Sequence, residues 1–358
     1  MTMRALIFPV CWLLLMSPAA WGTVFPDEPR ARTPLVISAA LDLSVVSPLL
    51  EAFQAAHPRI DVDFREDTTL AVNDSVSNGP PAPDVVISSA MPLQMARVND
   101  GWARRLDSPQ ARAWPDWAKW RNEVFGFTFE PIVMVYRLDL ARHMLPPQTH
   151  ADLQQLLTSH AELLDRRVTT YSPQVSAIGY TLSQQDARYS TRFWELVDAM
   201  GQLNAGLERD TQTMLEGINE GRYWLGYNLI GSYAMAYAQH HPDIIVQVPM
   251  DYSLVMMRMV FVHRDAEHPE AAETFVNFLL GPEGQHVLAG QTPLFSPLTD
   301  MAGPWTARRL REQVGEHLYP IPLDASLLAF VDPARREAFM RQWRETFGSV
   351  EDSPSASP

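Results

Sequence analysis

The stretch from residue 35 to residue 64, LVISAALDLSVVSPLLEAFQAAHPRIDVDF, decides the fold of this protein. It opens with Leu35 to Ile37, a short continuous apolar run that is typical of a strand buried on both faces. A helix is expected next, with Ser47 as its N-cap and Pro48 at its first position. The alternation from Ile60 to Phe64 indicates a second strand. Strand, helix and strand in this order predict a right-handed βαβ unit.

The same alternation recurs further along the chain. Val85 to Ile87 is another continuous apolar run, and the helical pattern of Met91 to Val98 follows it. A second set of strands and helices begins near Thr149. Two such sets predict an α/β protein with two lobes, whose mixed and mainly parallel sheets are flanked by helices. A length of 358 residues agrees with about two domains.

The composition argues against several classes of protein. The chain has 28 Lys and Arg against 42 Asp and Glu, a formal net charge of −14, which argues against non-specific binding to nucleic acid. A hydrophobic content of 46% excludes a mostly disordered chain. The sequence has no nucleophile elbow, zinc-protease motif or P-loop, so an enzyme is the least favoured class. The pair His240-His241 is expected at a solvated helix end, so neither a metal site nor a cofactor is expected.

The N-terminus has the pattern of an export signal. Met1 to Arg4 carries one positive charge, Ala5 to Met16 is apolar, and Ala20 to Gly22 supplies small residues for cleavage. A membrane anchor is less favoured, because the apolar run is too short to span about 30 Å of hydrocarbon. Residues 1–22 are therefore predicted to be a signal peptide, and the protein is expected in the periplasm. Cys11 is the only cysteine and lies within this segment, so the mature chain would have no thiol.

Small hydroxyl residues follow three predicted strands at the point where each strand ends. They are Ser38, the pair Ser88 and Ser89, and Ser172 with Ser176. Ligands of open α/β sheets bind beyond the carboxyl ends of the strands, where helix N-termini favour an anion. Taken singly, each serine is better explained as a helix N-cap, whereas three such strand ends together favour a binding site.

Three stretches resemble the type II periplasmic solute-binding proteins of ABC importers. They are residues 35–64, residues 84–101 (DVVISSAMPLQMARVNDG) and residues 268–290 (HPEAAETFVNFLLGPEGQHVLAG), of which the last is the most specific. The resemblance is to the group that contains ferric-iron and sugar-phosphate receptors. It implies two lobes, a hinge, and a ligand held in the cleft between the lobes.

The resemblance also implies where the lobes begin and end. Residues 34–130 and 255–350 are expected to form a discontinuous first lobe, and residues 131–254 the second lobe. The crossings between the lobes are expected near residues 127–136 and 248–254. The Ser, Pro and acidic residues at 351–358 predict a disordered tail.

The implied function is capture of a small organic anion, a carboxylate or a phosphorylated compound, for an ABC importer. Where ferric receptors have a His, a Glu and an adjacent Tyr pair, this chain has Ala39 and Ala40, Ser88 and Ser89, and a stretch from 228 to 233 without a Tyr pair. Free ferric iron is therefore not expected. The expected ligand-binding residues are Ser38, Ala39, Ser88, Ser89, Ala90, Ser172, Ser176, Asn228, Ser232, Tyr233 and Tyr252.

The expected partner remains open between two kinds of membrane protein. Some relatives, such as the phosphoglycerate transport regulatory protein, act as periplasmic receptors that signal to a sensor histidine kinase. The partners are thus a small solute and either an ABC permease or a sensor kinase at the inner membrane. A monomer without cofactors and without nucleic acid is expected.

Overall fold

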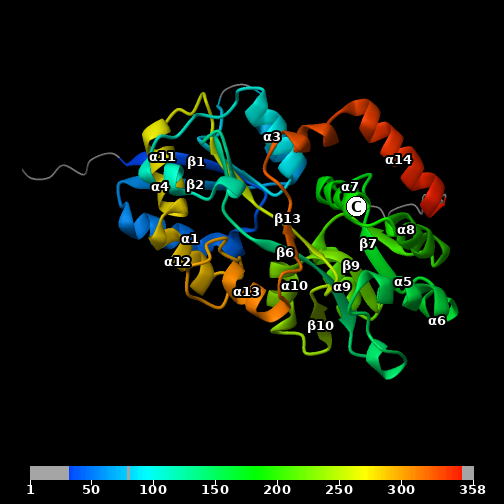
Figure 1. The fold of residues 1–358 in the computed structure, drawn as a ribbon. Coiled ribbons are helices and arrows are strands. Elements are labelled where there is room, and N and C mark those ends of the chain that lie inside the picture. Colours follow the sequence, from blue (N-terminus) through cyan, green and yellow to red (C-terminus); the bar gives the residue numbers. More distant parts are fainter. Residues whose placement is uncertain (1–31, 79–80, 349–358) are drawn as a thin grey trace, which may run out of the picture. The chain divides into compact units, whose positions relative to one another are not determined.

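The computed structural model describes residues 32–78 and 81–348. The predicted signal peptide at residues 1–22 and the predicted tail at residues 351–358 lie outside these described residues. Within them the chain forms two β-sheets with helices packed around each sheet, which confirms the predicted α/β class (Figure 1).

The first sheet is built from the N-terminal part of the chain and one strand that returns late. Its strands are β1 (Thr33–Ala39), β2 (Ile60–Glu66), β3 (Val85–Ser88), β4 (Lys119–Trp120), β5 (Val124–Gly126) and β12 (Met259–Val262). Their order in the sheet is β2-β1-β3-β12-β5-β4. β1 pairs in parallel with β2 and β3, as the βαβ pattern predicts. The returning strand β12 runs antiparallel to β3 and β5.

Helices pack around the first sheet and share its core. They are α1 (Leu43–Ala56), α2 (Thr69–Ser75), α3 (Met91–Asn99), α4 (Pro109–Ala113), η1 (Asp116–Ala118), α11 (Pro269–Leu280) and α12 (Pro282–Gln291). The apolar face of α1 buries Val46, Leu49 and Phe53. The ring of Phe53 meets the ring of Phe275 on α11 edge-on, with 5.0 Å between the ring centroids. A helix from the beginning of the chain and one from near its end therefore share one core.

Helix α1 begins earlier than the sequence predicts. Its first residue is Leu43, and Pro48 lies inside the helix. The amide of Leu43 donates to the carboxylate of Glu66, the last residue of β2, at 2.8 Å. The hydroxyl of Ser47, the predicted N-cap, instead donates to the carbonyl of Leu43 at 2.7 Å. The prediction was wrong because a residue distant in the sequence satisfies the helix N-terminus.

The second sheet has the order β13-β11-β6-β9-β7-β8, and β10 pairs with β6 beside this path. Its strands are β6 (Glu130–Arg137), β7 (Val168–Tyr171), β8 (Gly206–Glu208), β9 (Leu225–Ile230), β10 (Ile244–Gln247), β11 (Ser253–Met256) and β13 (Leu318–Pro320). β7 runs parallel to β8 and β9, whereas β6 runs antiparallel to β9, β10 and β11. Both sheets are mixed rather than mainly parallel, since β6 and β12 run against their neighbours.

A further set of helices lies between β6 and β10 along the chain. They are η2 (Leu140–Arg142), α5 (His150–Ser159), α6 (Ala161–Leu164), α7 (Ala177–Tyr189), α8 (Phe193–Gln202), α9 (Thr211–Asn219) and α10 (Gly231–Ala238). α10 follows β9 directly, because Ile230 ends the strand and Gly231 begins the helix. The N-terminus of α10 therefore lies directly at the C-terminal end of β9, a strand inside the second sheet.

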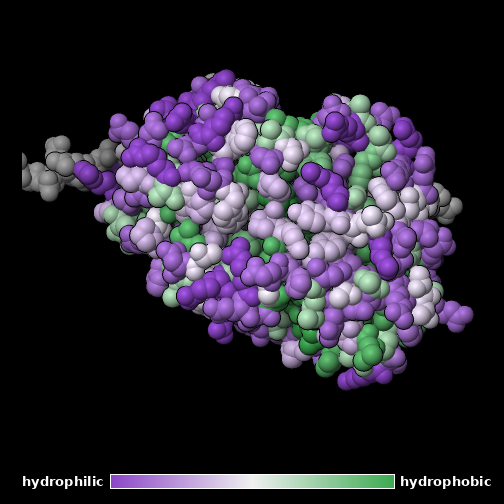
Figure 2. All heavy atoms as spheres, in the orientation of Figure 1, coloured by the Kyte–Doolittle hydropathy of each residue, from purple (hydrophilic) through white to green (hydrophobic). Residues whose placement is uncertain are grey.

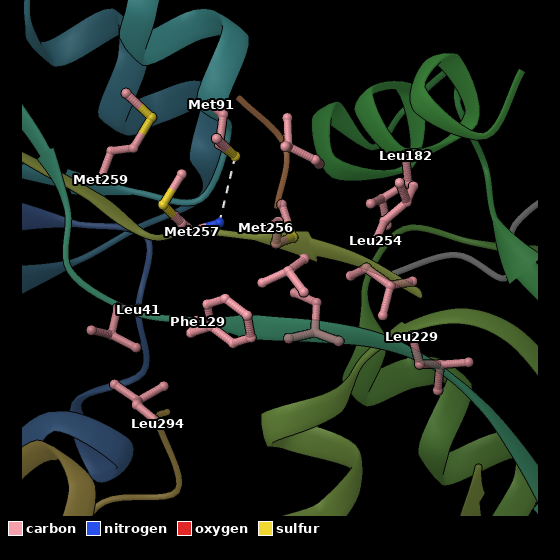
Figure 3. Packing of buried hydrophobic residues seen from close by; sticks show 14 of the residues in the cluster. Leu41, Met91, Phe129, Leu182, Leu229, Leu254, Met256, Met257, Met259 and Leu294 are labelled. Atoms are coloured by element: carbon pink, nitrogen blue, oxygen red, sulfur yellow. Dashed lines mark hydrogen bonds between the residues drawn. The ribbon is translucent and has the colours of Figure 1, made fainter. Parts of the chain in front are cut away.

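The chain passes from one sheet to the other at residues 127–129 and again at residues 257–258. Buried methionines surround the second crossing, and Figure 3 shows Met91, Met256 and Met257 around it. The amide of Met257 donates to the sulfur of Met91 at 3.5 Å. The first crossing lies at the start of the predicted segment, and the second lies slightly after the predicted one.

The last part of the chain differs from the expected lobe boundary. The remaining elements are α13 (Ala307–Val314), η3 (Ala325–Phe330) and α14 (Pro333–Phe347). Although residues 255–350 were all expected with the first sheet, β13 pairs with β11 in the second sheet and α14 packs on α8. The ring of Phe339 on α14 lies 5.3 Å from that of Trp194 on α8. This aromatic contact gives α14 a partner that its sequence does not reveal.

Gly201 of α8 is a position where α14 approaches so closely that a Cβ atom would collide with the main chain of Phe347. We expect Gly201→Ala to lower the free energy of unfolding by about 1–3 kcal/mol, because the backbone of one helix must move. Gly290→Ala on α12 is the matched control, since nothing lies within 4 Å of the added methyl group. Urea unfolding of both variants measures the difference, and equal stability would contradict this packing.

None of the helices in the described part of the chain is long and apolar enough to cross a membrane. Hydrophilic side chains cover most of the face shown in Figure 2, and the hydrophobic patches on it are small and scattered. Single exposed side chains such as Leu145 are normal on a protein surface and need no partner.

Candidate ligand-binding site

Four buried polar atoms mark the candidate site. Both carboxylate oxygens of Glu130, Nε of Arg258 and the hydroxyl oxygen of Ser232 have no hydrogen-bond partner within residues 32–78 and 81–348. Glu130 opens β6, Arg258 lies between β11 and β12, and Ser232 is the second residue of α10. Each unpaired buried polar group costs about 1–3 kcal/mol, so several at one place point to a group that a ligand completes. These three residues, with Asp42 and Tyr233, are called the Arg258 cluster below.

Arg258 is held by main-chain and side-chain groups of the first half of the chain. Its Nε lies 3.4 Å from a carboxylate oxygen of Glu130, and their side chains are only 3% and 1% exposed. One terminal guanidinium nitrogen donates to the carbonyl of Ala40 at 3.2 Å. The amide of Arg258 donates to the hydroxyl of Thr128 at 2.9 Å. The guanidinium is thus fixed in place while its Nε is left available.

Tyr233 and Asp42 close the other side of the cluster. The hydroxyl of Tyr233 donates to the carboxylate of Asp42. The ring of Tyr233 lies under the guanidinium of Arg258, with 5.1 Å from the guanidinium carbon to the ring centroid, a cation–π distance. Asp42 precedes α1 beyond the end of β1, and Tyr233 lies on α10 beyond the end of β9. Strand ends of both sheets therefore meet at this point.

The N-terminus of α10 adds a positive end to the site. This helix of eight residues has no side-chain cap among the described residues, so its first amides and its dipole favour a negative group. A Cβ atom at Gly231 would lie 2.6 Å from the carbonyl oxygen of Pro131, the residue after Glu130. Glycine at this position thus allows the helix N-terminus to press against β6.

Burial raises the pKa of the Glu130 carboxyl above its usual value, whereas the neighbouring charge of Arg258 acts in the opposite direction. The nearby hydroxyls of Ser232 and Thr128 also lower this pKa. With both carboxyls ionised, the cluster has one positive charge against two negative charges, from Glu130 and Asp42. Its charge balance therefore depends on whether Glu130 holds a proton.

Of the predicted residues in the first half of the chain, the structure brings Ser88 next to the segment that holds Arg258. Ser88 pairs with Met259, the residue that follows Arg258, and its hydroxyl accepts from the amide of Ala90 at 3.2 Å. Ser89 and Ala39 are buried at the ends of their strands. The hydroxyl of Ser38 lies 3.3 Å from that of Ser75 on α2, so it is already engaged within the first half.

Ser172 and Ser176 form hydrogen bonds at the N-terminus of α7. The hydroxyl of Ser176 caps the helix by accepting from the amide of Gly179 at 3.1 Å. The carbonyl of Ser172 accepts from the amide of Ser176 at 2.9 Å. For Ser176 the structure thus shows the N-cap that the sequence left open as an alternative.

Asn228 and Tyr252 belong to a separate cluster centred on the buried carboxyl of Asp186. The amide of Asn228 donates to Asp186 at 2.6 Å, and the hydroxyls of Tyr227 and Tyr252 donate at 2.8 Å and 3.2 Å. Burial raises the pKa of Asp186, while the nearby His150 and these hydrogen bonds lower it. Both carboxylate oxygens have partners, so this cluster is a satisfied internal network.

Replacement of Ser176 by alanine is expected to change stability, whereas replacement of Ser232 by alanine is expected to change solute affinity. We expect Ser176→Ala to lower the free energy of unfolding by about 0.5–2 kcal/mol without changing solute affinity, because it removes a cap. Ser232→Ala removes a buried hydroxyl without a described partner, so we expect little loss of stability but an affinity loss of about 0.5–1.5 kcal/mol. Thermal unfolding and titration calorimetry on both variants measure the two effects. The reverse pattern would contradict the site.

Sequence reasoning missed Asp42, Glu130 and Arg258. The signal for Arg258 was visible, since it is the charge that interrupts the apolar run from Leu254 to Val262. Glu130 likewise interrupts the apolar stretch from Val124 to Tyr136. A charge inside a buried strand needs a partner, which only the folded chain brings to it.

A cavity of about 640 Å³ is lined by residues of α10, of α13 and of the segment before α13. Its lining includes Met235 of α10, Phe295, Trp305, and Arg308 and Arg309 of α13. The carbonyl of Phe295 accepts from the amide of Phe129 at 2.8 Å, one residue before Glu130. This volume lies in the range of small-molecule pockets.

Comparison with known proteins identifies the family. Residues 36–291 match the model of the bacterial extracellular solute-binding proteins, so the chain belongs to this family. It is 32% identical to the substrate-binding protein of an ABC transporter from Agrobacterium tumefaciens, with a TM-score of 0.83 and coverage of 88% of this chain and 96% of that one. The protein is therefore a solute-binding protein of the ABC-transporter type, a non-enzymatic class. Comparison with curated protein sequences gives no significant match.

More distant structures share the two-lobed fold alone. AfuA from Actinobacillus pleuropneumoniae, with fructose-6-phosphate bound, is 15% identical with a TM-score of 0.69, covering 89% of this chain and 99% of that one. Iron-bound HitA from Pseudomonas aeruginosa is also 15% identical with a TM-score of 0.69, at 88% and 99% coverage. Among the residues that the structure describes, no three His, Cys, Asp or Glu side chains gather as a metal site would require.

Proposed function

We propose that this protein captures a small organic anion, a carboxylate or a phosphorylated compound, at the Arg258 cluster in the periplasm. The observation that carries the proposal is a buried guanidinium whose Nε forms an ion pair with Glu130 at 3.4 Å but no hydrogen bond within the described residues, together with the hydroxyl of Ser232, which also has no hydrogen bond there. Arginine with a helix N-terminus is a common way to hold carboxylate or phosphate. The polar, uncharged residues at the ends of β1 and β3 leave the ligand sets of ferric receptors unmatched.

The solute enters and leaves by movement of the two sides of the cluster. The hydrogen bond between Tyr233 and Asp42 closes the site in this structure. The chain crosses between the sheets only at residues 127–129 and 257–258 before β13 and α14, so these short segments are the proposed hinge.

A thermal-shift screen tests the class of solute. Carboxylates and phosphate esters are compared with uncharged analogues of the same carbon skeleton, because a ligand selective for the folded state raises Tm. At 100 times its Kd, a true solute adds about 2.7 kcal/mol to the free energy of unfolding. We expect anions to raise Tm and their neutral analogues to have no effect. Stabilisation by neutral or cationic solutes alone would contradict the proposal.

The proposed partner is an ABC permease at the inner membrane, with the protein acting as a monomer. The similarity to the substrate-binding protein of an ABC transporter supports this choice over a sensor kinase. Where a permease gene lies beside the gene of this protein, its deletion should abolish uptake of the identified solute. Loss of a transcriptional response with unchanged uptake would favour the sensor kinase.

A further inference from the structure

The Arg258 cluster holds an internal competitor for any anionic solute. The carboxylate of Glu130 already lies 3.4 Å from Nε of Arg258. Yet neither of its oxygens has a hydrogen bond to another described residue, and Nε has none either. The pair is therefore close but poorly bonded, and its geometry leaves both partners open to other contacts.

The charges around this pair oppose an anion when all carboxyls are ionised. Asp42, which precedes the first residue of α1, contributes a carboxylate to the cluster and accepts a hydrogen bond from the hydroxyl of Tyr233 on α10. Tyr171 of β7 is a further polar group whose pKa the charge of Arg258 affects, and its hydroxyl is hydrogen-bonded to that of Thr211 on α9. Asp210 caps the same helix α9 and lies close enough to Tyr171 to raise the pKa of its hydroxyl. With Glu130 and Asp42 both ionised, the single guanidinium thus has two carboxylates beside it.

We propose that an anionic solute binds together with a proton, which neutralises Glu130 and frees the guanidinium of Arg258 for the solute. This inference rests on the proposed function and adds a regulatory element to the same site. The proton goes to a carboxylate oxygen of Glu130, and no covalent bond of the solute changes. Ser232, whose hydroxyl lacks a described partner, lies close enough to Glu130 to affect the pKa of its carboxyl.

The direction of the pH effect follows from the charges. Burial already raises the pKa of Glu130, and a bound anion raises it further, because a like charge disfavours the carboxylate. The complex therefore holds the proton more tightly than the free protein does. Affinity for an anion rises as pH falls, by up to about tenfold per pH unit for one linked proton.

Sulfate is the probe, since it stays a dianion between about pH 5 and pH 8 and contributes no titration of its own. Titration calorimetry in two buffers of different ionisation enthalpy gives the number of protons taken up. For the unmodified protein we expect uptake of close to one proton over part of this range, with tighter binding at the lower pH. For Glu130→Gln we expect no proton uptake and pH-independent binding as tight as that of the unmodified protein at low pH.

Asp186→Asn is the matched control, because Asp186 is a second buried carboxyl with a raised pKa that belongs to another cluster. We expect this variant to keep the pH dependence of sulfate binding. The proton count of the unmodified protein keeps the test valid even if one variant fails to fold.

Two outcomes overturn different parts of the account. Sulfate binding that does not change with pH and takes up no proton would refute the linkage while leaving the anion site intact. If sulfate binds at no pH and cationic or neutral solutes bind instead, the proposed class of solute is wrong, and the linkage falls with it.

Discussion

Arg258→Met is expected to lower the free energy of unfolding by about 3–5 kcal/mol and to abolish anion binding. Removal of the guanidinium leaves Glu130 buried at 1% exposure without its ionic partner. It also removes the contact to the carbonyl of Ala40 and the cation–π contact with Tyr233. Urea unfolding near pH 7.5 measures the stability, and calorimetry with sulfate measures the binding.

The double variant Arg258→Met with Glu130→Leu separates stability from binding. Replacing both members of a buried pair by apolar groups is often neutral or stabilising. We therefore expect the double variant to regain most of the stability while it still fails to bind sulfate. Binding of sulfate by the double variant would show that Arg258 is not the anion receptor. An Arg258→Met variant as stable as the unmodified protein would equally contradict the assigned role of Arg258.

Solute binding is expected to shift the protein toward the closed form. A compact chain of the size of residues 32–358 has a radius of gyration of about 20 Å, and an open form has a larger one. In this structure Tyr233 of α10 lies against Asp42, beyond the end of β1, and a solute that contacts both sides is expected to favour this arrangement over a more open one. Small-angle X-ray scattering with and without the true solute should show a decrease in this radius.

Tyr233→Phe tests the same contact while keeping Arg258 and the aromatic ring that lies against its guanidinium. Loss of the hydroxyl removes the bond to Asp42, so we expect a larger radius of gyration in the absence of solute. Tyr237→Phe on the same helix is the matched control, because the ring of Tyr237 stacks on His241 of the same segment. A radius that does not change under saturating solute would argue for a rigid module rather than a hinged receptor.

The fold could be predicted from the sequence because its signals are local. The apolar runs at residues 35–37 and 85–87 lie in β1 and β3, with the parallel pairing that the βαβ pattern requires. The start of α1 could not be predicted, since the cap comes from Glu66 on β2. The position of α14 could not be predicted either, because its partner α8 lies far away in the sequence.

The candidate site was predicted only in part for the same reason. Of the serines predicted at strand ends, Ser88 lies beside the candidate site, since it pairs with the neighbour of Arg258. The sequence pattern cannot distinguish a serine that caps a helix, such as Ser176, from one whose hydroxyl is buried without a described partner, such as Ser232. The charged centre itself is assembled from residues 130 and 258, and only the fold brings them within 3.4 Å.

The position of a bound oxyanion shows directly whether an anion binds at Arg258 and Ser232. Crystals of the protein grown with selenate, a tetrahedral anion like sulfate, locate the selenium atom by its anomalous scattering. We expect a selenium peak at the Arg258 cluster, with oxygens of the selenate ion at hydrogen-bond distance, about 2.7–3.2 Å, from the guanidinium of Arg258 and the hydroxyl of Ser232. A peak confined to the arginines of α13, or none at the Arg258 cluster at saturating selenate, would contradict it.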